Sequence, residues 1–507
     1  MENMATRLNG LMILLLGLAW SLSACAPQVS SASAQLANPA LEGQAAAQPA
    51  PAVQDHPAPV VQPARPVYAP GELVDYVAQA GDTLPQLAIR FNTSVEEILE
   101  TNDFIPESAT TMPPGMPMKI PIYYRPFWGS SFQILPDSLF VNGPAQVGFD
   151  TAAFVSVQPG WLKDYTGYVG EKNRSGAEIV DYIALRYSVS PRLLLALLEY
   201  QAGALSQPQL NPGQEDFPLG YVDWQHKGLY MQLGWAANFL NNGYYEYRTS
   251  DLKELEFKDG RLMVFDPWQN AATVSLHKYF NTLLSHEDYE WAVSPDGFVK
   301  TYTALFGDPW VADVPHLPGS LEQPEFTLPF EPGYVWAMTG GPHTGWGLGA
   351  PLAAIDFAPP SKSSGCIESG VWATAVAPGL VVRSEIGVVV LDLDGDGDER
   401  TGWSIFYLHI ATEGRAQVGA QLERGAKIGH PSCEGGAATG THIHIARKYN
   451  GEWLPAGGFH GLLAFNLEGW VAENGSRPYL GRLVRFSQVV TACECSNAAS
   501  FIETGRR

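Results

Sequence analysis

Four histidines and one aspartate have the residue types and spacing that could support metal chemistry in this chain. His442 and His444 stand two positions apart, and residues two apart on a β-strand project from the same face. Asp356 lies in an apolar run, where a carboxylate needs a partner; His343 precedes it in a Gly/Pro-rich turn, and His409 ends another apolar run. Three protein ligands with one position open to water are typical of catalytic zinc, so a His–Asp–His set predicts hydrolysis.

In chain order, these segments resemble the lysostaphin-type zinc endopeptidases of bacterial cell-wall metabolism. The resemblance spans roughly residues 325–450 and includes the stretch 418–429 and the small-residue turn 435–440. It implies two groups of functional residues: His343, Asp356 and His444 as ligands of one catalytic Zn²⁺, and His409 and His442 as the catalytic pair that handles protons and the oxyanion. The assignment of the proton-handling role and the oxyanion role between His409 and His442 stays open.

One feature departs from the family pattern, which places the first His and the Asp closer together. Here thirteen positions separate His343 from Asp356. A Gly/Pro-rich loop can leave and return without displacing either residue far, so we expect His343 to remain a ligand. His316 is the nearest rival ligand but lies in a linker-like run, and His430 precedes a proline, where a turn position is expected.

The N-terminus has the features of an export signal. A short apolar run followed by Leu22-Ser23-Ala24-Cys25 is typical of a signal peptide rather than a membrane span, and the box resembles a bacterial lipoprotein signal. That resemblance implies lipidation of Cys25; the alternative is an ordinary cleaved signal with a chance cysteine. Residues 26 to about 70 are rich in Ala, Pro, Gln and Ser, which predicts a disordered spacer.

The segment after the spacer predicts a strand, a Gly-Asp-Thr turn that caps a helix, a second apolar helical stripe and a closing strand at 115–121. It resembles a LysM (lysin-motif) domain with βααβ order. The resemblance implies binding of N-acetylglucosamine-containing glycan in a groove between the loops, and thus targeting to peptidoglycan.

The third unit is rich in helix signals, with Ser190-Pro191 opening one helix. It resembles the lysozyme-like lytic transglycosylases, whose catalytic acid is a Glu at the end of this helix. Gln201 stands at that place and cannot cycle a proton, while Glu199 faces another direction. We therefore expect an inactive domain that holds glycan or packs the structure, rather than an active glycosidase.

Composition excludes some partners. The chain has 507 residues with a net charge of -22, which argues against nucleic acid because phosphate binding needs clustered Lys and Arg. Its 14 Trp and 21 Tyr favour recognition by stacking and hydrogen bonds.

Two further patterns concern cysteines and aspartates. Four cysteines follow Cys25 in an exported context, with Cys366–Cys433 the favoured disulfide and a Cys-x-Cys metal site at 493–495 the alternative. The run of alternating carboxylates resembles the start of a Ca²⁺ loop but has Trp403 where the final Glu is expected, so a solvated hairpin tip is an equal alternative. The possible Ca²⁺ ligands are Asp392, Asp394, Asp396 and Asp398.

The sequence thus predicts a multidomain α+β protein with a small LysM domain, a mostly α-helical lysozyme-like domain and an antiparallel β-rich metallopeptidase domain. The expected function is a cell-wall zinc endopeptidase, exported and lipid-anchored to the outer face of the membrane or cell envelope, that hydrolyses the peptide stems or cross-bridges of peptidoglycan. The alternative is a non-catalytic wall-binding protein or hydrolase activator, and the third is a glycan-cleaving enzyme. The expected boundaries are 1–24 for the lipoprotein signal, 25–70 for the linker, 74–122 for LysM, 145–312 for the helical domain and 325–490 for the metallopeptidase domain.

Overall fold

A computed structural model describes residues 66–505 apart from 124–127 and 362. The expected signal peptide, Cys25 and most of the linker lie outside the described residues. No helix in the described part of the chain combines the length and apolar character needed to cross a membrane.

The first unit consists of β1 (Glu72–Val77), α1 (Leu84–Phe91), α2 (Val95–Thr101) and β2 (Pro117–Ile122), with β1 and β2 antiparallel. Thr83 caps α1 as expected, because its side chain accepts a hydrogen bond from the Gln86 N–H. Leu87, Phe91, Ile98 and Ile120 are fully buried between the strands and the helices.

One residue of the predicted linker belongs to the folded part of the chain. Tyr68 packs against the core of the first unit, with its ring centroid 6.2 Å from that of Trp268. An aromatic ring that finds a partner surface can be ordered by it even at the end of a Pro-rich segment. The boundary of the expected linker at 70 stays a prediction.

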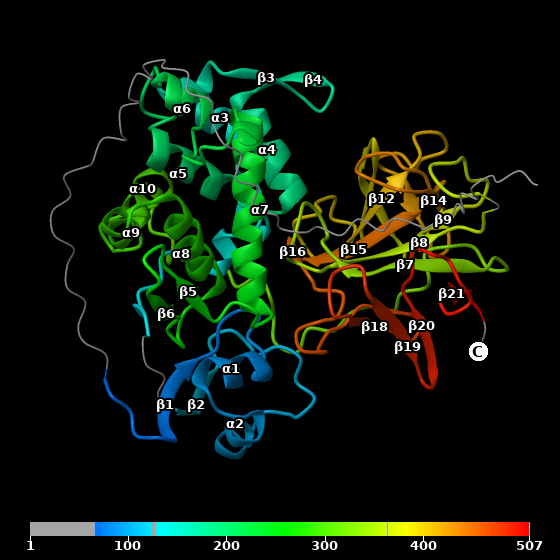
Figure 1. Cartoon of the computed structure of the whole chain (residues 1–507), viewed down its shortest axis with the longest axis horizontal. Coiled ribbons are helices and arrows are strands. Elements are labelled where there is room, and N and C mark those ends of the chain that lie inside the picture. The colour runs from blue at the N-terminus through cyan, green and yellow to red at the C-terminus, as the bar shows by residue number, and fades with distance from the viewer. Residues whose placement is uncertain (1–65, 124–127, 362, 506–507) are drawn as a thin grey trace, which may run out of the picture. The chain divides into compact units, whose positions relative to one another are not determined.

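The middle unit is mostly helical, and Figure 1 shows α4, α7 and α8 among its longest helices. Ser190 caps α5 with Pro191 at its first position, as predicted, and residues 193–198 of this helix are fully buried. The core also takes in residues from Ile134 onward. Its elements are η1 (Asp137–Leu139), η2 (Pro144–Gln146), α3 (Thr151–Ser156), η3 (Trp161–Lys163), β3 (Thr166–Val169), β4 (Lys172–Ser175), α4 (Gly176–Tyr187), α5 (Pro191–Ala202), α6 (Pro212–Asp216), η4 (Trp224–His226), α7 (Leu229–Arg248), β5 (Glu254–Glu256), β6 (Leu262–Val264), α8 (Ala271–Leu283), α9 (His286–Ala292) and α10 (Phe298–Phe306).

The last unit is built on antiparallel sheets. Among the described residues, nine strands form the main sheet in the order β13-β10-β11-β12-β15-β8-β7-β21, with β16 paired to β15. A smaller sheet has the order β17-β18-β19-β20, and β14 pairs with β9. The strands are β7 (Trp336–His343), β8 (Ala354–Ala358), β9 (Ala373–Thr374), β10 (Gly379–Glu385), β11 (Gly387–Asp392), β12 (Trp403–Ile410), β13 (Gln421–Leu422), β14 (Lys427–Gly429), β15 (Ile443–Tyr449), β16 (Glu452–Trp453), β17 (Asn466–Leu467), β18 (Trp470–Asn474), β19 (Gly481–Arg485), β20 (Gln488–Thr491) and β21 (Phe501–Ile502).

The two faces of β15 have different neighbours. Ile443 and Ile445 lie in the apolar core of the sheet unit, whereas Ala446 belongs to the core cluster that extends into the helical unit. His444 shares the second face because side chains alternate along a strand. His444 therefore points to the side of the sheet that the helices cover.

A buried carboxylate joins three parts of the chain. Glu452 on β16 accepts hydrogen bonds from Tyr244 Oη at 2.9 Å, from Arg248 at 3.3 Å and from His316 Nε2 at 2.5 Å. This contact gives His316 a structural partner away from the expected metal ligands, so the rival ligand assignment for His316 is wrong.

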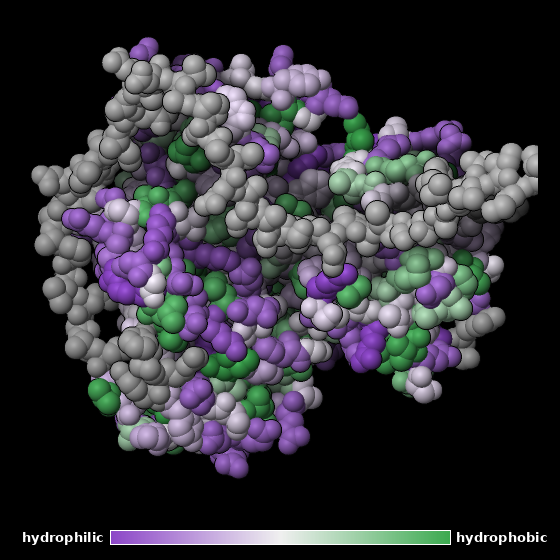
Figure 2. Space-filling model, in the orientation of Figure 1, coloured by the Kyte–Doolittle hydropathy of each residue, from purple (hydrophilic) through white to green (hydrophobic). Residues whose placement is uncertain are grey.

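The predicted Cys366–Cys433 disulfide is present, and Cys493 and Cys495 form a second disulfide in place of the alternative Cys-x-Cys metal site. On the face shown in Figure 2, hydrophilic residues gather over α9, and hydrophobic residues occur in small separate groups.

Candidate metal centre

Three neighbouring strands bring the predicted ligands together. His343 ends β7, Asp356 lies within β8 and His444 lies within β15, where it stands directly opposite Asp356 in the register. β7 also pairs with β8, so the chain needs only a connection between them to return from His343 to Asp356. A Cβ atom at Gly340, opposite Asp356, would lie 2.5 Å from the Asp356 Oδ2 atom, so the glycine makes room for the carboxylate.

The three candidate ligand atoms converge on one point. His343 Nε2 lies 3.0 Å from His444 Nδ1, and Asp356 Oδ1 lies 3.2 Å and 3.3 Å from these two nitrogens. A tetrahedral zinc ion with ligands at its usual distances separates the ligand atoms by about 3.3 Å. All three side chains are buried, so any cation held there would be screened little by solvent.

The remaining ring nitrogens fix which atoms face the centre. His343 Nδ1 lies 2.8 Å from the Gly341 carbonyl, and His444 Nε2 lies 3.1 Å from the Gly345 carbonyl. A carbonyl oxygen only accepts hydrogen bonds, so each of these nitrogens carries the proton. The opposite nitrogens then present lone pairs toward each other, which is the arrangement that metal-binding histidines require.

The surroundings of the Asp356 carboxylate also favour a bound cation. Asp356 Oδ1 is buried and has no hydrogen-bond partner in the described part of the chain, although two histidine nitrogens lie near it. Burial opposes the charged form, but the adjacent His343 outweighs it and holds the pKa of Asp356 well below its usual value. Burial likewise opposes the charged form of His343, yet the Asp356 charge raises the pKa of this histidine. The donor set therefore fits a divalent metal ion.

His409 and His442 lie beside this centre. Their ring centroids are 4.3 Å apart, and His442 Nε2 lies 3.9 Å from Asp356 Oδ2. Their Nδ1 atoms face backbone carbonyls, those of Glu434 at 2.9 Å and Gly440 at 2.8 Å, so Nε2 is unprotonated in each neutral ring. Burial, followed by the neighbouring histidines, lowers the pKa of His409 to about 3, which keeps this ring neutral near pH 7.

A β-bulge turns His409 toward the site. Strict alternation would place its side chain on the same face as Tyr407, which lies in the opposite core. However, Leu408 pairs with Val388 and Ile410 pairs with Gly387, so His409 is an extra residue in the ladder, with φ of 65°. Such bulges re-aim a side chain at the cost of local strain.

The long interval between His343 and Asp356 is a loop held by α7. The Leu348 N–H donates to Asn238 Oδ1, and the Ala350 N–H donates to Asn242 Oδ1, both at 2.7 Å. The loop therefore extends outward to the helix and returns into β8. At its start, the Gly345 carbonyl keeps its hydrogen bond from His444 Nε2.

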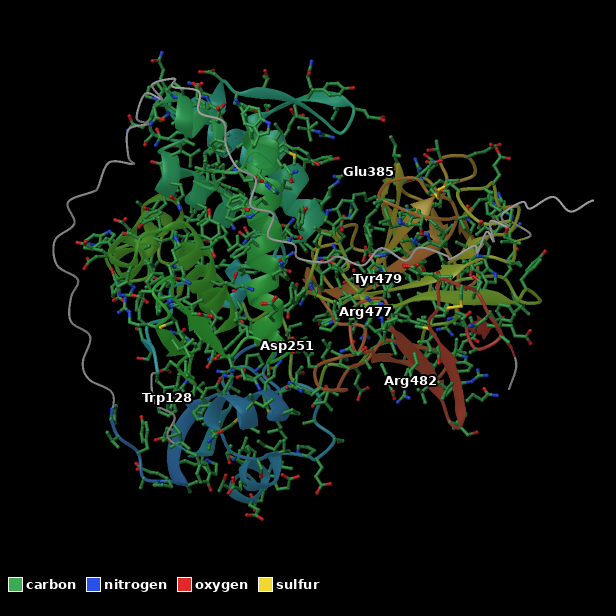
Figure 3. The ribbon with its side chains drawn as sticks, viewed as in Figure 1. Trp128, Asp251, Glu385, Arg477, Tyr479 and Arg482 are labelled. Atoms are coloured by element: carbon green, nitrogen blue, oxygen red, sulfur yellow. A yellow bond between two sulfur atoms is a disulfide. The ribbon has the colours of Figure 1, made fainter. Side chains whose placement is uncertain are left out.

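Tyr479 is a residue of the site that the sequence analysis missed. It lies in the connection between β18 and β19, where it is labelled in Figure 3, and its ring stacks on His343 with centroids 4.2 Å apart and planes 22° apart. The Gly341 N–H donates to the Tyr479 carbonyl at 2.8 Å, which fixes this connection against β7. No local pattern marks this residue, because it reaches the site through the packing of a second sheet.

Comparisons with known proteins agree with this organisation. Residues 76–121 match the LysM domain model, and residues 133–319 match the model described as LasA, N-terminal domain. Protease LasA of Pseudomonas aeruginosa is 25% identical over 338 residues, which cover 63% of this chain and 74% of that protein. The beta-lytic metalloendopeptidase of Achromobacter lyticus is 29% identical over 139 residues, which cover 26% of this chain and 35% of that protein. Among solved structures, the M23 metalloprotease pseudoalterin is 21% identical, with 34% of this chain and 96% of that chain covered and a TM-score of 0.27.

These matches confirm the predicted LysM segment, and the relatives in sequence are peptidases. The lysozyme-like resemblance of 145–312 stays a prediction. Within that segment, Glu199 Oε2 accepts hydrogen bonds from the Leu205 and Ser206 N–H groups, and Gln201 Nε2 is buried without a partner among the described residues. Glu199 thus stabilises a turn.

The acidic run lies between β11 and β12, at the tip of a hairpin. Candidate ligand oxygens of Asp392, Asp394 and Asp396 lie within 4.8 Å of one another, but Asp398 forms an ion pair with Arg400 at 2.6 Å and stands outside this group. Ca²⁺ binding there stays a prediction. The backbone of the run forms the hairpin tip that is the alternative reading of this segment.

Proposed function

We propose that this protein is an exported zinc endopeptidase that hydrolyses peptide bonds of peptidoglycan. The observation that carries the proposal is the convergence of His343 Nε2, Asp356 Oδ1 and His444 Nδ1, with both other nitrogens of the two rings donating to carbonyls. A buried set of three donors leaves one position of a tetrahedral ion open to water or substrate, as hydrolysis requires.

His343, Asp356 and His444 would hold the zinc ion. When bound, zinc would polarise the scissile carbonyl and lower the pKa of a water molecule. His409 and His442 supply the remaining chemistry. One ring accepts the proton of the attacking water at Nε2 and returns it to the leaving amine; the other, protonated at Nε2 by a proton from solvent, donates a hydrogen bond to the oxyanion and keeps that proton.

Peptidoglycan is proposed as the substrate on two grounds. The LysM match supports binding of glycan that contains N-acetylglucosamine, and the sequence relatives include a protease and a metalloendopeptidase. We also propose that Cys25 carries a lipid anchor, which would hold the enzyme at the outer face of the membrane or cell envelope. Replacement of Cys25 by Ala should move the protein from the membrane fraction to the soluble exported fraction.

The decisive experiment compares the wild-type chain with His444→Ala for zinc content and for release of amino groups from purified peptidoglycan. We expect about one zinc per wild-type chain, with zinc and amine release both lost in His444→Ala. The matched control is His430→Ala, since this histidine packs against the Trp372 ring and bonds to the Val371 carbonyl away from the centre. Zinc without amine release would indicate a wall-binding protein or hydrolase activator, and absence of zinc would refute the proposal.

A second experiment separates the metal ligands from the proton-handling pair. His409→Ala and His442→Ala should each lower turnover by about 10²–10⁴-fold, the range for loss of a general acid or base. Zinc content should stay at the wild-type value in both variants. Loss of zinc from either variant would reassign that histidine to the ligand set.

A further inference from the structure

The Cys366–Cys433 disulfide joins two loops that lie beside His409 and His442, the proton-handling pair. It connects residues 67 positions apart in the chain, and its Cα atoms are 5.8 Å apart. Neither sulfur can bind metal or attack a substrate while the bond is intact, because those roles belong to a free thiolate. Any effect of the two cysteines on the reaction must therefore act through residues that their loops hold.

The loop that contains Cys433 holds His409. The Glu434 carbonyl faces His409 Nδ1 at 2.9 Å, and the Ser432 N–H donates to the His409 carbonyl at 2.7 Å. Ser432 Oγ also donates to that carbonyl and accepts from the Glu434 N–H, both at 3.0 Å. The residues on both sides of Cys433 therefore fix the backbone and the ring of His409.

The loop that contains Cys366 holds Thr441, the residue before His442. The Thr441 N–H donates to the Gly365 carbonyl at 3.1 Å. Its buried hydroxyl donates to the Ile367 carbonyl at 2.6 Å and accepts from the Ile367 N–H at 2.8 Å. The residues on both sides of Cys366 therefore fix the backbone that carries His442.

The two loops also meet at His442 itself. The Gly440 carbonyl, directly before Thr441, faces His442 Nδ1 at 2.8 Å. The His442 N–H donates at 3.3 Å to the carbonyl of Ser432, the residue that bonds the His409 backbone. The disulfide thus closes a ring of contacts that includes both members of the proton-handling pair.

The candidate metal ligands have separate supports. His343 Nδ1 faces the Gly341 carbonyl. His444 Nε2 faces the Gly345 carbonyl, and its strand pairs with that of Asp356. These contacts involve neither of the two disulfide-linked loops, so opening of the bond should disturb the proton-handling pair and leave the ligand set in place.

We propose that Cys366 and Cys433 are positioning residues for His409 and His442, so that the intact disulfide sets the rate of turnover but not the zinc content. Misplacement of a reacting group by about 1 Å can cost about 10²-fold in rate. The effect on turnover rests on the proposed function, whereas the effect on the two histidine rings does not.

The first test compares the zinc-loaded wild-type chain with Cys366→Ala/Cys433→Ala for amine release from peptidoglycan. The variant should lower kcat by about 10–100-fold. KM should stay near the wild-type value, because the lost positioning acts on the transition state rather than on substrate binding. Zinc content should equal that of the wild type.

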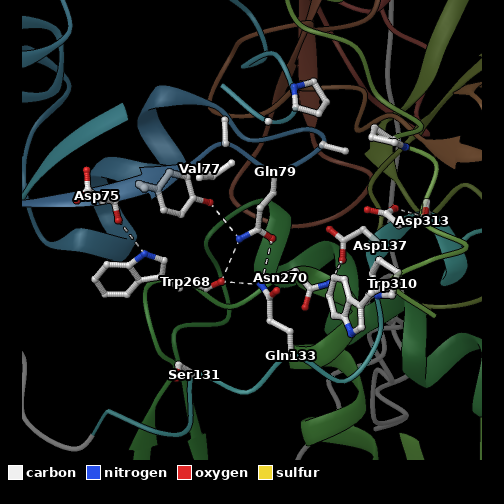
Figure 4. Close-up of a pocket in the computed structure, with 18 of the residues that line it drawn as sticks. Asp75, Val77, Gln79, Ser131, Gln133, Asp137, Trp268, Asn270, Trp310 and Asp313 are labelled. Atoms are coloured by element: carbon white, nitrogen blue, oxygen red, sulfur yellow. Dashed lines mark hydrogen bonds between the residues drawn. The ribbon is translucent and has the colours of Figure 1, made fainter. Parts of the chain in front are cut away.

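Two control variants remove structural contacts away from the proton-handling pair. Cys493→Ala/Cys495→Ala removes the second disulfide, which lies after β20. Gln133→Ala removes a hydrogen bond outside the metallopeptidase domain, since Gln133 Nε2 donates to the Trp268 carbonyl at 2.7 Å (Figure 4). Both variants should keep the wild-type kcat.

The second test changes only the oxidation state, so it does not depend on the folding of a chain that lacks Cys366 and Cys433. Cys366 is exposed and Cys433 is half-buried, so a soluble reductant can reach the bond. In Cys493→Ala/Cys495→Ala, a water-soluble phosphine adds two electrons and two protons to the remaining disulfide, and the phosphine becomes its oxide with oxygen from water. Turnover should fall on reduction and return when glutathione disulfide re-forms the bond.

The third test is independent of cleavage and of bound metal. Histidine labelled with ¹⁵N in the metal-free chain reports exchange of each ring N–H with solvent. In Cys366→Ala/Cys433→Ala, the Nδ1–H groups of His409 and His442 should exchange at least about tenfold faster than in the wild type, because their loops open locally. The His343 Nδ1–H group should keep its rate.

Three outcomes would overturn the proposal: wild-type turnover after loss of the Cys366–Cys433 bond, unchanged ring exchange, or loss of zinc from the double variant. Loss of zinc would assign the disulfide to support of the metal ligands. If the wild-type chain binds zinc but releases no amines, the proposed function fails, and ring exchange alone decides whether the disulfide positions the two histidines.

Discussion

Two buried carboxylate centres lie along the same face of β15, four residues apart, and they are completed in opposite ways. At one end, His444 faces Asp356; at the other, Lys448 Nζ lies 2.7 Å from Glu399. Phe406 on the adjacent strand separates them, with its ring 6.1 Å from the His444 ring and 5.8 Å from the Arg383 guanidinium.

The difference lies in the partners of each carboxylate. Glu399 has two fixed cations, since Arg383 donates to it at 2.7 Å and 3.0 Å in addition to Lys448. Asp356 has only histidines, whose facing nitrogens carry lone pairs, and its Oδ1 is left without a hydrogen bond among the described residues. A buried carboxylate with its cations supplied by the chain stabilises the fold, whereas one that lacks them requires a cation from solution.

The largest expected effect is on the centre formed by His343, Asp356 and His444, called the open centre because it has no fixed cation. Asp356→Asn removes the charge that attracts the metal ion, so zinc affinity should fall by more than the roughly 10–100-fold that loss of an outer partner costs. Amine release from peptidoglycan should disappear, while the metal-free protein should lose less free energy of unfolding than the roughly 3–5 kcal/mol that breaking a buried pair with fixed cations costs. Competition titration with a chelator and denaturant unfolding measure the two quantities. Unchanged zinc affinity would remove Asp356 from the ligand set.

At the centre formed by Glu399, Arg383 and Lys448, called the closed centre, we expect the opposite result: stability falls and zinc affinity does not. Glu399→Gln leaves two cations buried without their counter-charge and should lower the free energy of unfolding by about 3–5 kcal/mol. Zinc affinity of the folded protein should stay near the wild-type value. The matched control is Glu385→Gln, which removes a half-exposed partner of Arg186 and should cost about 1 kcal/mol or less. Equal costs in the two variants would contradict the comparison.

The closed centre also predicts a pH dependence. Burial alone would raise the pKa of Glu399, but Arg383 and Lys448 outweigh it and lower this pKa from 4.5 to about 2. A carboxyl whose folded pKa is depressed binds more protons when unfolded, so its stabilisation is complete above pH 4.5 and is lost as pH falls toward 2. The contribution is on the order of 3 kcal/mol. Unfolding of wild type and Glu399→Gln across this window should show the slope diminished in the variant; identical slopes would refute the assignment.

The smallest effect should come from Tyr479, which touches the open centre from a different sheet. Loss of its stacking on His343 in Tyr479→Ala should weaken zinc binding by about 2–10-fold, the equivalent of one aromatic contact. Tyr479→Phe keeps the ring and should bind zinc like the wild type. If Tyr479→Phe were as weak as Tyr479→Ala, the hydroxyl rather than the ring would be responsible.

Much of the fold and of the candidate site could be predicted because the signals are local. Ser190-Pro191 and Thr83 mark helix starts through side-chain capping, which depends on adjacent residues alone. His442 and His444 share a face because strand geometry repeats every two residues. The structure also confirms the favoured Cys366–Cys433 pairing, although this disulfide joins residues 67 apart and rests on no local signal.

The sequence by itself determined which residue types were available for metal chemistry and that His442 and His444 would share a strand face; His343, expected in a turn, ends β7. Only the tertiary structure decided how they meet: β8 pairs with β7 and β15, α7 holds the loop after His343, a bulge turns His409 toward His442, and a second sheet places Tyr479 over His343. The tertiary structure also pairs His316 with Glu452 through a hydrogen bond and packs Tyr68 against a folded core. The physical reason is that pairing register, bulges and contacts between distant segments depend on how whole surfaces pack, and neighbouring residues do not encode that.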